Sequence, residues 1–413
     1  MAYRVESLMS ARLFLVPQHS GGRIFFLSNL SGHLSLYAMN RGGSVPEPLL
    51  PPHIALQNPE LIGGYSFRVF PRLKRILVMI DRDGDENYQP MLIPMEGGFP
   101  EPAFDNFFSG YRVHLQACDC AKGIVYLLAE SRDSAVYETW RANLKTGERV
   151  KLAASPWGFS PMAHNASHSK ALLLEGYSTG DSALYLAAGG KLRLLYGKPL
   201  GERAEGEEVP LNGLGAAAFT SGGALVTSSV FEDAYGLSFI RFSKPGTMLP
   251  VKVKGIVHKG EGEMVGLEPL AEGRYLAQYN IDGCSWAYEG LFDEEKLTMT
   301  YKRVLVGDGK LANGTLGHID WDEEADLFAL SFSTATSPTQ IYTIEGASRG
   351  KVIQHTAERT LGIPGGILSA GEDASFVSHD GLRVSARLYL PAASLGFKGK
   401  RPLVYYIHGG PQG

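Results

Sequence analysis

The sequence has few cysteines, no long apolar run and no block of basic residues. Three cysteines among 413 residues exclude a disulfide-rich scaffold and indicate a reducing compartment. The apolar run at residues 13–16 is too short for a signal peptide, and no stretch approaches the roughly 20 apolar residues of a membrane-spanning helix. The net charge is −4 and basic residues are dispersed, which argues against a nucleic-acid partner. We therefore expect a cytoplasmic protein that binds neither membranes nor nucleic acids.

Patterns that would bind a metal or a cofactor are also incomplete. Cys118 and Cys120 share one face of a strand but lack further ligands, so we interpret them as strand residues. The acidic turn from Asp81 to Glu86 lacks the glycine and glutamate of an EF-hand and is interpreted as a solvated hairpin turn, although another kind of cation site stays open. His164 and His168 have the spacing of two metal ligands on a helix, but they fall in a turn-like stretch. Gly213, Gly215 and Ala218 have the spacing of a dinucleotide-binding fingerprint, but they precede a strand instead of a helix. We expect no cofactor and no metal.

Glycine and proline, by contrast, are abundant. The 50 glycines and 23 prolines predict many turns and short strands. A unit of two apolar strands and a glycine-rich exit recurs seven times, with starts 47 to 54 residues apart. The copies begin at Arg23, Lys74, Gly123, Lys170, Ala224, Arg274 and Ala325.

This period predicts a seven-bladed β-propeller, because each unit is a small sheet that must bury its faces on its neighbours. A β-sandwich with accidental spacing is the alternative. The sixth copy matches least, because its second strand runs into Asp293, Glu294 and Glu295, which we interpret as a solvated turn.

Two stretches have the Gly-x-Ser-x-Gly pattern of a nucleophile elbow. They are residues 176–180 (GYSTG) and 346–350 (GASRG). An elbow joins a strand to a helix, whereas one of these stretches joins two strands and the other leaves the seventh repeat. We interpret both as ordinary turns.

The pattern changes after Gly346. A short strand at 374–377, a hairpin signal at Asp380-Gly381 and an alternating stretch at 382–390 precede an apolar run at 403–407, which is typical of a buried parallel strand. His408, Gly409 and Gly410 follow it directly. In α/β-hydrolases an HGG turn after the third strand supplies backbone N–H groups to the oxyanion. A simple chain-reversing turn is the alternative. His408 precedes any nucleophile and is therefore misplaced for the catalytic base.

These residues resemble the prolyl oligopeptidase family of serine peptidases, nearest its acylaminoacyl-peptidase-like branch. The resemblance rests on four stretches: SHDGLRVSARLYLP (378–391), IHGGP (407–411), DRDGDENYQ (81–89) and SPTQIYTIE (337–345). It implies an all-β, seven-bladed propeller at residues 1–355, followed at 356–413 by the first strands of an α/β-hydrolase domain. It also implies hydrolysis of short, including N-acylated, peptides by Ser-Asp-His catalysis, with the N–H of Gly410 donating to the oxyanion while His408 and Gly409 shape the loop.

The resemblance places the catalytic serine, aspartate and histidine after the HGGP stretch. We therefore expect residues 1–413 to be an inactive N-terminal fragment of a longer enzyme, because the apolar run at 403–407 needs parallel neighbours and covering helices. A non-catalytic propeller scaffold and an esterase of the same fold remain alternatives. The sequence does not decide the oligomeric state.

Overall fold

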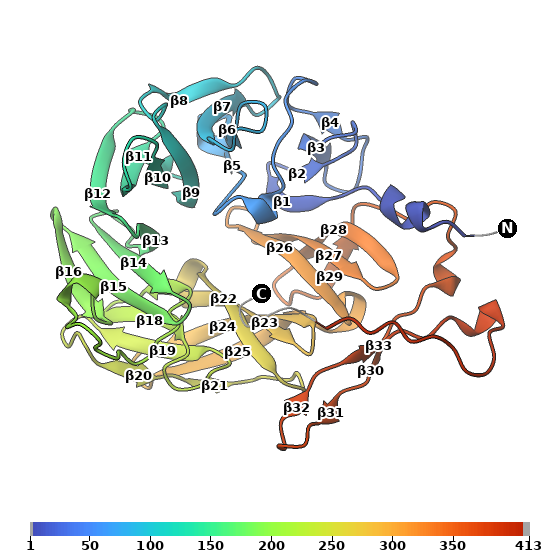
Figure 1. The fold of residues 1–413 in the computed structure, drawn as a ribbon. Coiled ribbons are helices and arrows are strands. Elements are labelled where there is room, and N and C mark those ends of the chain that lie inside the picture. Colours follow the sequence, from blue (N-terminus) through green and yellow to red (C-terminus); the bar gives the residue numbers. More distant parts are fainter. Residues whose placement is uncertain (1–2, 408–413) are drawn as a thin grey trace.

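The computed structural model describes residues 3–407, in which seven antiparallel sheets are arranged as blades around a central channel (Figure 1). Strands that are consecutive in sequence are neighbours within each blade, and blade 6 carries a fifth strand, β21, parallel to its outer strand β25. The seven-bladed propeller predicted from the repeat is confirmed.

The strands are given blade by blade. Blade 1 contains β1 (Leu15–Ser20), β2 (Arg23–Ser28), β3 (Ser35–Asn40) and β4 (Glu47–Pro48); blade 2 contains β5 (Phe67–Phe70), β6 (Arg75–Ile80), β7 (Gln89–Pro94) and β8 (Glu101–Asn106). Blade 3 contains β9 (Tyr111–Asp119), β10 (Ile124–Ser131), β11 (Tyr137–Asn143) and β12 (Arg149–Ser155); blade 4 contains β13 (Phe159–His164), β14 (Lys170–Ser178), β15 (Asp181–Ala188) and β16 (Lys191–Tyr196). Blade 5 contains β17 (Ala217–Phe219), β18 (Gly223–Ser228), β19 (Gly236–Arg241) and β20 (Met248–Pro250). Blade 6 contains β21 (Lys252–Lys254), β22 (Gly262–Pro269), β23 (Arg274–Ile281), β24 (Cys284–Asp293) and β25 (Thr298–Val306); blade 7 contains β26 (Gly314–Asp322), β27 (Leu327–Thr334), β28 (Ser337–Glu345) and β29 (Lys351–Gln354).

The repeats recognised in the sequence are the second and third strands of each blade. These strands are covered on both faces by neighbouring blades, so they carry the long apolar runs, as in β2 and β6. The first and fourth strands lie at the channel and at the outer rim, where polar residues are tolerated, and their pattern is weaker. Outer strands such as β4 and β8 are largely exposed.

The hydrophobic core consists of seven separate layers, one between each pair of neighbouring blades. The layer that closes the ring packs Phe14, Ile24 and Phe26 of the first blade region against Ile341 of β28. His19 of β1 and Asp322 of β26 add a 2.6 Å contact between ring Nδ1 and carboxylate Oδ2. The first and last blades share no strand, so side-chain packing and polar contacts hold this seam.

The acidic turn of blade 6, between β24 and β25, is exposed but not merely solvated. Glu294 accepts hydrogen bonds from the Ser221 hydroxyl at 2.7 Å and from the Gly222 amide at 2.9 Å. Ser221 and Gly222 belong to the β17–β18 turn of blade 5. This turn therefore connects two blades, which the sequence pattern did not indicate.

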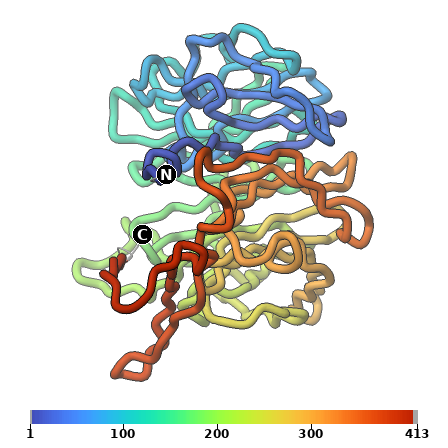
Figure 2. The backbone as a smooth tube through the Cα atoms, turned by 90° about the vertical axis from the view of Figure 1, so that its right-hand side faces the viewer, coloured from blue at the N-terminus to red at the C-terminus, as the bar shows by residue number. Residues whose placement is uncertain are grey.

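The chain after Gln354 runs along one side of the ring as an extended segment (Figure 2). It contains two short strand pairs, β30 (Glu372–Asp373) with β33 (Arg387–Leu388) and β31 (Phe376–Val377) with β32 (Arg383–Val384). Arg383 holds Asp282, in the β23–β24 turn, through bonds of 2.6 and 3.0 Å, and Ser385 donates to the same carboxylate at 3.0 Å. The segment is thereby tied to blade 6.

The prediction of a buried strand at residues 403–407 is wrong for the structure as described. These five residues form no strand, and their side chains are 70 to 92% exposed. A parallel strand needs neighbours on both edges and cover on both faces, and the described residues provide neither. The hairpin expected around Asp380-Gly381 is present as β31–β32.

The helices of the described residues are short 3₁₀ helices of three residues each, apart from η1, which has six. They are η1 (Val5–Ser10), η2 (Pro59–Leu61), η3 (Pro71–Leu73), η4 (Leu200–Glu202), η5 (Ala271–Gly273), η6 (Gly309–Leu311), η7 (Gly365–Ile367) and η8 (Ala393–Leu395). None of them is long and apolar enough to cross a membrane.

Candidate functional site

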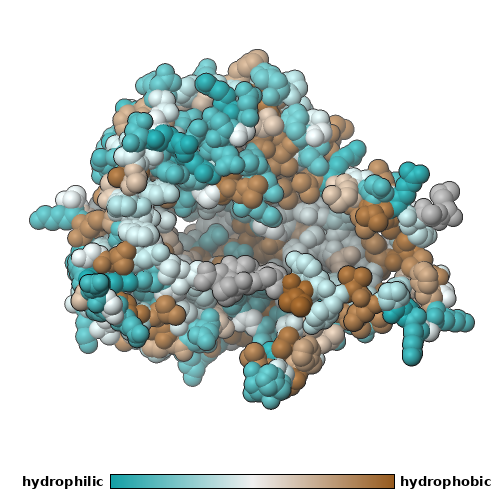
Figure 3. Space-filling model, viewed as in Figure 1, coloured by the Kyte–Doolittle hydropathy of each residue, from teal (hydrophilic) through white to brown (hydrophobic). Residues whose placement is uncertain are grey.

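The centre of the ring is hollow, as the space-filling view shows (Figure 3). A cavity of about 680 Å³ lies there, lined by the inner strands β1, β9, β22 and β26, by the segment before β5 and by parts of β27 and β28. Its walls include Tyr65, Gln116, Glu268 and His318. This volume is in the range of small-molecule and peptide-binding cavities, so the channel is a candidate binding site.

The Gly63-Gly64 pair places Tyr65 at this cavity. Gly64 has a φ of 115°, and a Cβ at this position would lie 2.3 Å from the carbonyl oxygen of Leu115. Only glycine allows this approach of blade 2 to blade 3. The Tyr65 amide then donates to the same Leu115 oxygen at 2.7 Å.

The main ion pair of the channel joins Arg68 of β5 to Asp320 of β26. The guanidinium Nη1 and the carboxylate Oδ1 are 2.5 Å apart, and both side chains are largely buried. The guanidinium also lies 4.9 Å from the centre of the Tyr65 ring. The pair connects blade 2 to blade 7, the two neighbours of blade 1 in the ring. It therefore adds a contact across the place where the first and last blades meet.

Two further titratable groups face this ion pair. Burial raises the pKa of Glu268 to about 7, and the nearby charge of Asp320 adds to the effect. Burial lowers the pKa of His318 to about 4, so its imidazole is neutral at physiological pH. The channel therefore combines one satisfied ion pair, one neutral histidine and the carboxyl group of Glu268, which is exposed to the channel.

Cys118 and Cys120 are both interpreted from the sequence as strand residues, but only Cys118 lies in β9, and Cys120 lies in the turn that follows; both are near Arg68. A hydrogen bond from Cys118, together with Arg68, holds the pKa of the Cys120 thiol below its ordinary value, although burial opposes the shift. Burial raises the pKa of Cys118. Both cysteines are free and half-buried. The pair therefore differs in acidity, a property that the spacing did not reveal.

The predicted oxyanion residues His408, Gly409 and Gly410 lie outside the described residues. Their role stays a prediction. Within residues 3–407 no group of three or more histidine, cysteine, aspartate or glutamate side chains is arranged to hold a metal ion. His164 and His168 contact each other, but His168 is engaged with Tyr126 and Asp119.

The acidic turn at 81–86 joins β6 to β7 and is satisfied internally. Asp85 accepts hydrogen bonds from the amides of Arg82 and Asn87, at 3.1 and 3.0 Å, and Asp81 accepts one from the amide of Glu86 at 3.2 Å. These backbone contacts explain the carboxylates without a bound cation.

Neither Gly-x-Ser-x-Gly stretch joins a strand to a helix, as predicted. Residues 176–178 of GYSTG belong to β14 and only residues 179–180 form the hairpin turn, whereas GASRG lies wholly between its two strands. GYSTG joins β14 to β15 and GASRG joins β28 to β29. GASRG nevertheless has a structural role that the sequence did not predict, because Arg349 turns inward from it. The Arg349 backbone is left-handed, with a φ of 59°, and its guanidinium is buried.

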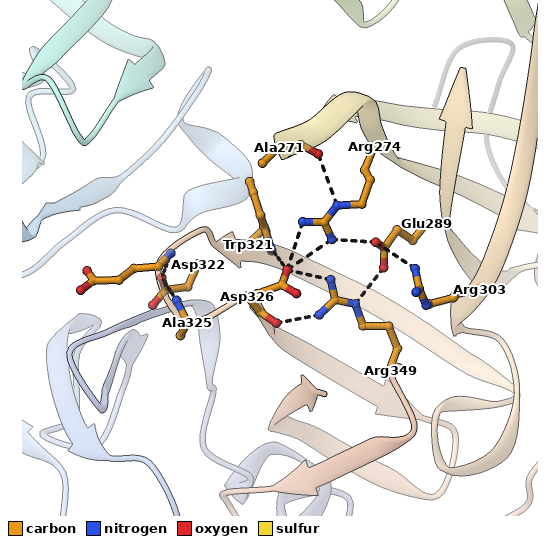
Figure 4. Close-up of polar contacts among 10 residues, drawn as sticks. Ala271, Arg274, Glu289, Arg303, Trp321, Asp322, Ala325, Asp326 and Arg349 are labelled. Carbon is orange, nitrogen blue, oxygen red and sulfur yellow. Dashed lines mark hydrogen bonds and ion pairs between the residues drawn. The ribbon is translucent and has the colours of Figure 1, made fainter. Parts of the chain in front are cut away.

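Arg349 is the centre of a polar network between blades 6 and 7 (Figure 4). Its guanidinium donates to Glu289 at 2.8 Å, to the Asp326 carboxylate at 2.8 Å and to the Asp326 carbonyl at 2.6 Å. Glu289 also accepts from Arg274 at 2.7 Å and from Arg303 at 3.3 Å. Burial alone raises the pKa of Glu289, but the hydrogen bonds from Arg349 and Arg274 outweigh it and hold the pKa below its ordinary value.

The fold and the channel define the chain as a seven-bladed propeller, followed by an extended segment held against one side of the ring. No family model matches the sequence, and no curated protein matches it. Solved structures do match it.

The crystal structure of a puromycin hydrolase is similar over 94% of this chain and 60% of its own, with a TM-score of 0.66 and 13% identity. Prolyl oligopeptidase B from Galerina marginata is similar over 92% and 56%, with a TM-score of 0.61 and 11% identity. A puromycin-hydrolyzing peptidase from Mycobacterium tuberculosis is similar over 91% and 58%, with a TM-score of 0.61 and 13% identity.

The chain thus spans about 60% or less of the length of these structures. A match over 94% of the chain is longer than the seven blades and extends into the segment after Gln354. At 11–13% identity the comparison establishes the fold. That fold agrees with the prolyl oligopeptidase resemblance of the sequence.

Proposed function

We propose that this chain forms the propeller and the beginning of the catalytic domain of a longer, cytoplasmic serine peptidase of the prolyl oligopeptidase type. The observation that supports this most strongly is the similarity to peptidases of that architecture over both the ring and the segment that follows it. The proposed enzyme cleaves short peptides, N-acylated ones included.

The chemistry proposed is acyl transfer by a Ser-Asp-His triad located after Pro411. The serine oxygen bonds to the substrate carbonyl carbon while its proton passes to the histidine, which then protonates the departing amine. Water hydrolyses the resulting ester and restores the serine. The N–H of Gly410 donates to the oxyanion, and such a donor contributes about 10²- to 10³-fold to kcat.

The exposed apolar segment at 403–407 supports this proposal. Five consecutive side chains from Leu403 to Ile407 are 70 to 92% exposed, and Phe376, Leu382 and Tyr389 of the same region are exposed too. Soluble proteins rarely leave so contiguous an apolar surface uncovered. In the proposed enzyme the rest of the hydrolase sheet and its helices cover it.

The propeller acts in this proposal as a filter for substrate size. The central cavity is enclosed by the inner strands of several blades. A folded protein is larger than this space, whereas an extended peptide is about one strand wide. Substrates are therefore limited to short peptides.

The test is an assay of the full-length protein with chromogenic acylated and free dipeptides and with the matching esters. We expect amide hydrolysis that disappears when the serine of a Gly-x-Ser-x-Gly stretch after residue 413 is replaced by alanine. Activity that survives this replacement contradicts the mechanism. Hydrolysis of the esters alone identifies an esterase, and inactivity of the intact protein toward both classes supports a binding scaffold.

A further inference from the structure

The channel cavity contains an acidic group without a partner. Glu268 lies near the end of β22 and is exposed to the channel, and within residues 3–407 its carboxylate has no hydrogen-bond or ion-pair partner. The nearby Arg68 is already paired with Asp320 at 2.5 Å, so its charge is used. His318 is neutral at physiological pH. When Glu268 ionises, the cavity therefore carries an uncompensated negative charge.

Two buried hydroxyls of the same cavity also lack partners. Ser66 and Ser331 are each 1% exposed and line the cavity together with Glu268 and His318, and their hydroxyl groups make no hydrogen bond among the described residues. The Nε2 atom of His318 is likewise unpaired. Buried polar groups in native proteins are nearly always hydrogen-bonded, so this set of groups points to a ligand that supplies donors.

We propose that the channel cavity binds the cationic end group of a peptide, an ammonium or a guanidinium, with Glu268 as its counter-ion. The hydroxyls of Ser66 and Ser331 and the Nε2 atom of His318 accept its remaining N–H donors. A small metal cation fits less well, since no three metal-ligating side chains of residues 3–407 converge. The peptide nature of the ligand rests on the proposed function, whereas the charge preference rests on the cavity itself.

The position of Glu268 along the channel sets a length requirement. Glu268 is paired with Leu276, close to the β22–β23 turn, whereas Asp282 at the other end of β23 contacts the C-terminal segment. Leu276 and Asp282 are six residues apart along this extended strand, which corresponds to roughly 20 Å along the channel. A peptide anchored at Glu268 must therefore contain about six or seven residues to reach the side of the ring where the C-terminal segment lies. Dipeptides are too short to occupy both places.

The first experiment measures binding directly, by calorimetry at pH 8. The probes are two acetylated and amidated octapeptides that differ only in one terminal residue, lysine or norleucine. We expect the intact protein to bind the lysine peptide about fivefold more tightly, as for an ion pair in a water-accessible site. Glu268→Gln removes this preference and Glu268→Asp retains part of it. Glu295→Gln, the same charge change in the exposed β24–β25 turn of blade 6, leaves the preference intact.

A preference that survives Glu268→Gln, or is absent from the intact protein, overturns the proposal. Circular dichroism checks that each variant is folded. If Glu268→Gln does not fold, the binding preference is measured with Glu268→Asp instead.

A second measurement separates this inference from the proposed function. Hydrolysis of acetylated dipeptide chromogens by the wild-type full-length protein tests the peptidase proposal independently of the charge preference. Loss of hydrolysis in the wild type contradicts the peptidase proposal but leaves the binding result valid.

Discussion

Replacing Arg349 by methionine removes the centre of the network between blades 6 and 7. Methionine keeps much of the side-chain length but loses the three hydrogen bonds to Glu289 and Asp326. Removing one partner of a buried ion pair typically costs about 3–5 kcal/mol, because the other charge stays buried. Glu289, which is 1% exposed, keeps Arg274 at 2.7 Å and Arg303 at 3.3 Å. We therefore expect a somewhat smaller loss, about 2–4 kcal/mol of unfolding free energy.

The matched control is Arg303→Met. Arg303 contacts the same carboxylate through one 3.3 Å bond, but its side chain is 37% exposed. An ion pair that is open to solvent contributes about 0–1 kcal/mol, so this variant is expected to be nearly as stable as the wild type. Both substitutions remove one positive charge, and the difference between them measures how much more the buried arginine with three hydrogen bonds contributes than the partly exposed arginine with one.

The measurement is urea denaturation followed by tryptophan fluorescence, with the free energy taken from the midpoint and slope. A double-mutant cycle of Arg349→Met with Glu289→Gln gives the coupling, expected to be at least about 1 kcal/mol. If Arg349→Met and Arg303→Met differ by less than about 0.5 kcal/mol, the network does not stabilise the ring as argued.

Three further predictions concern the channel and the seam. Cys120 is expected to react with iodoacetamide at pH 7.5 faster than Cys118, because its thiol is the more acidic of the two; peptide mass mapping that shows equal labelling contradicts this. His318 has a folded pKa of about 4 and an unfolded value near 6.5, so the unfolded state binds an extra proton at this residue between these values, and the contribution of His318 to stability falls as the pH drops from about 6.5 to 4. The raised pKa of Glu268 acts in the opposite direction, so the contribution of His318 is taken from the difference between wild type and variant. His318→Asn should flatten this part of the pH profile measured by urea denaturation, and an unchanged slope refutes the assignment. Ile341→Ala empties a fully buried position between blades 7 and 1 and should cost about 2–5 kcal/mol by the same method; a cost below about 1 kcal/mol means that the seam relaxes around the cavity.

The propeller could be predicted from the sequence because the central strands of each blade are buried on both faces. This burial requires an apolar run in every repeat, and RIFFLS from Arg23 and RILVMI from Arg75 show it clearly. The channel could not be predicted in the same way. Its residues come from inner strands that are far apart in sequence, such as Arg68 and Asp320, and neither strand has a distinctive pattern.

The C-terminal segment shows the opposite limit of sequence reasoning. The apolar run at 403–407 has the composition of a buried strand, but the described residues give it no neighbours, and it is exposed. Composition predicts the environment that a segment needs, whereas the surrounding chain decides whether that environment is present.

The amino-acid sequence by itself determined the number of blades and the length of each, since a recurring apolar pair with turn residues is a local property of the chain. Only the tertiary structure decided which polar groups meet. The pairing of Arg68 with Asp320 depends on closing the ring, which brings these two residues together across 252 positions of the chain. The place of Glu268 in the cavity depends on the same closure, whereas the inward turn of Arg349 depends on the packing of blade 7 against blade 6. Electrostatic energies depend on distance and burial, so they could be assessed only after that closure was known.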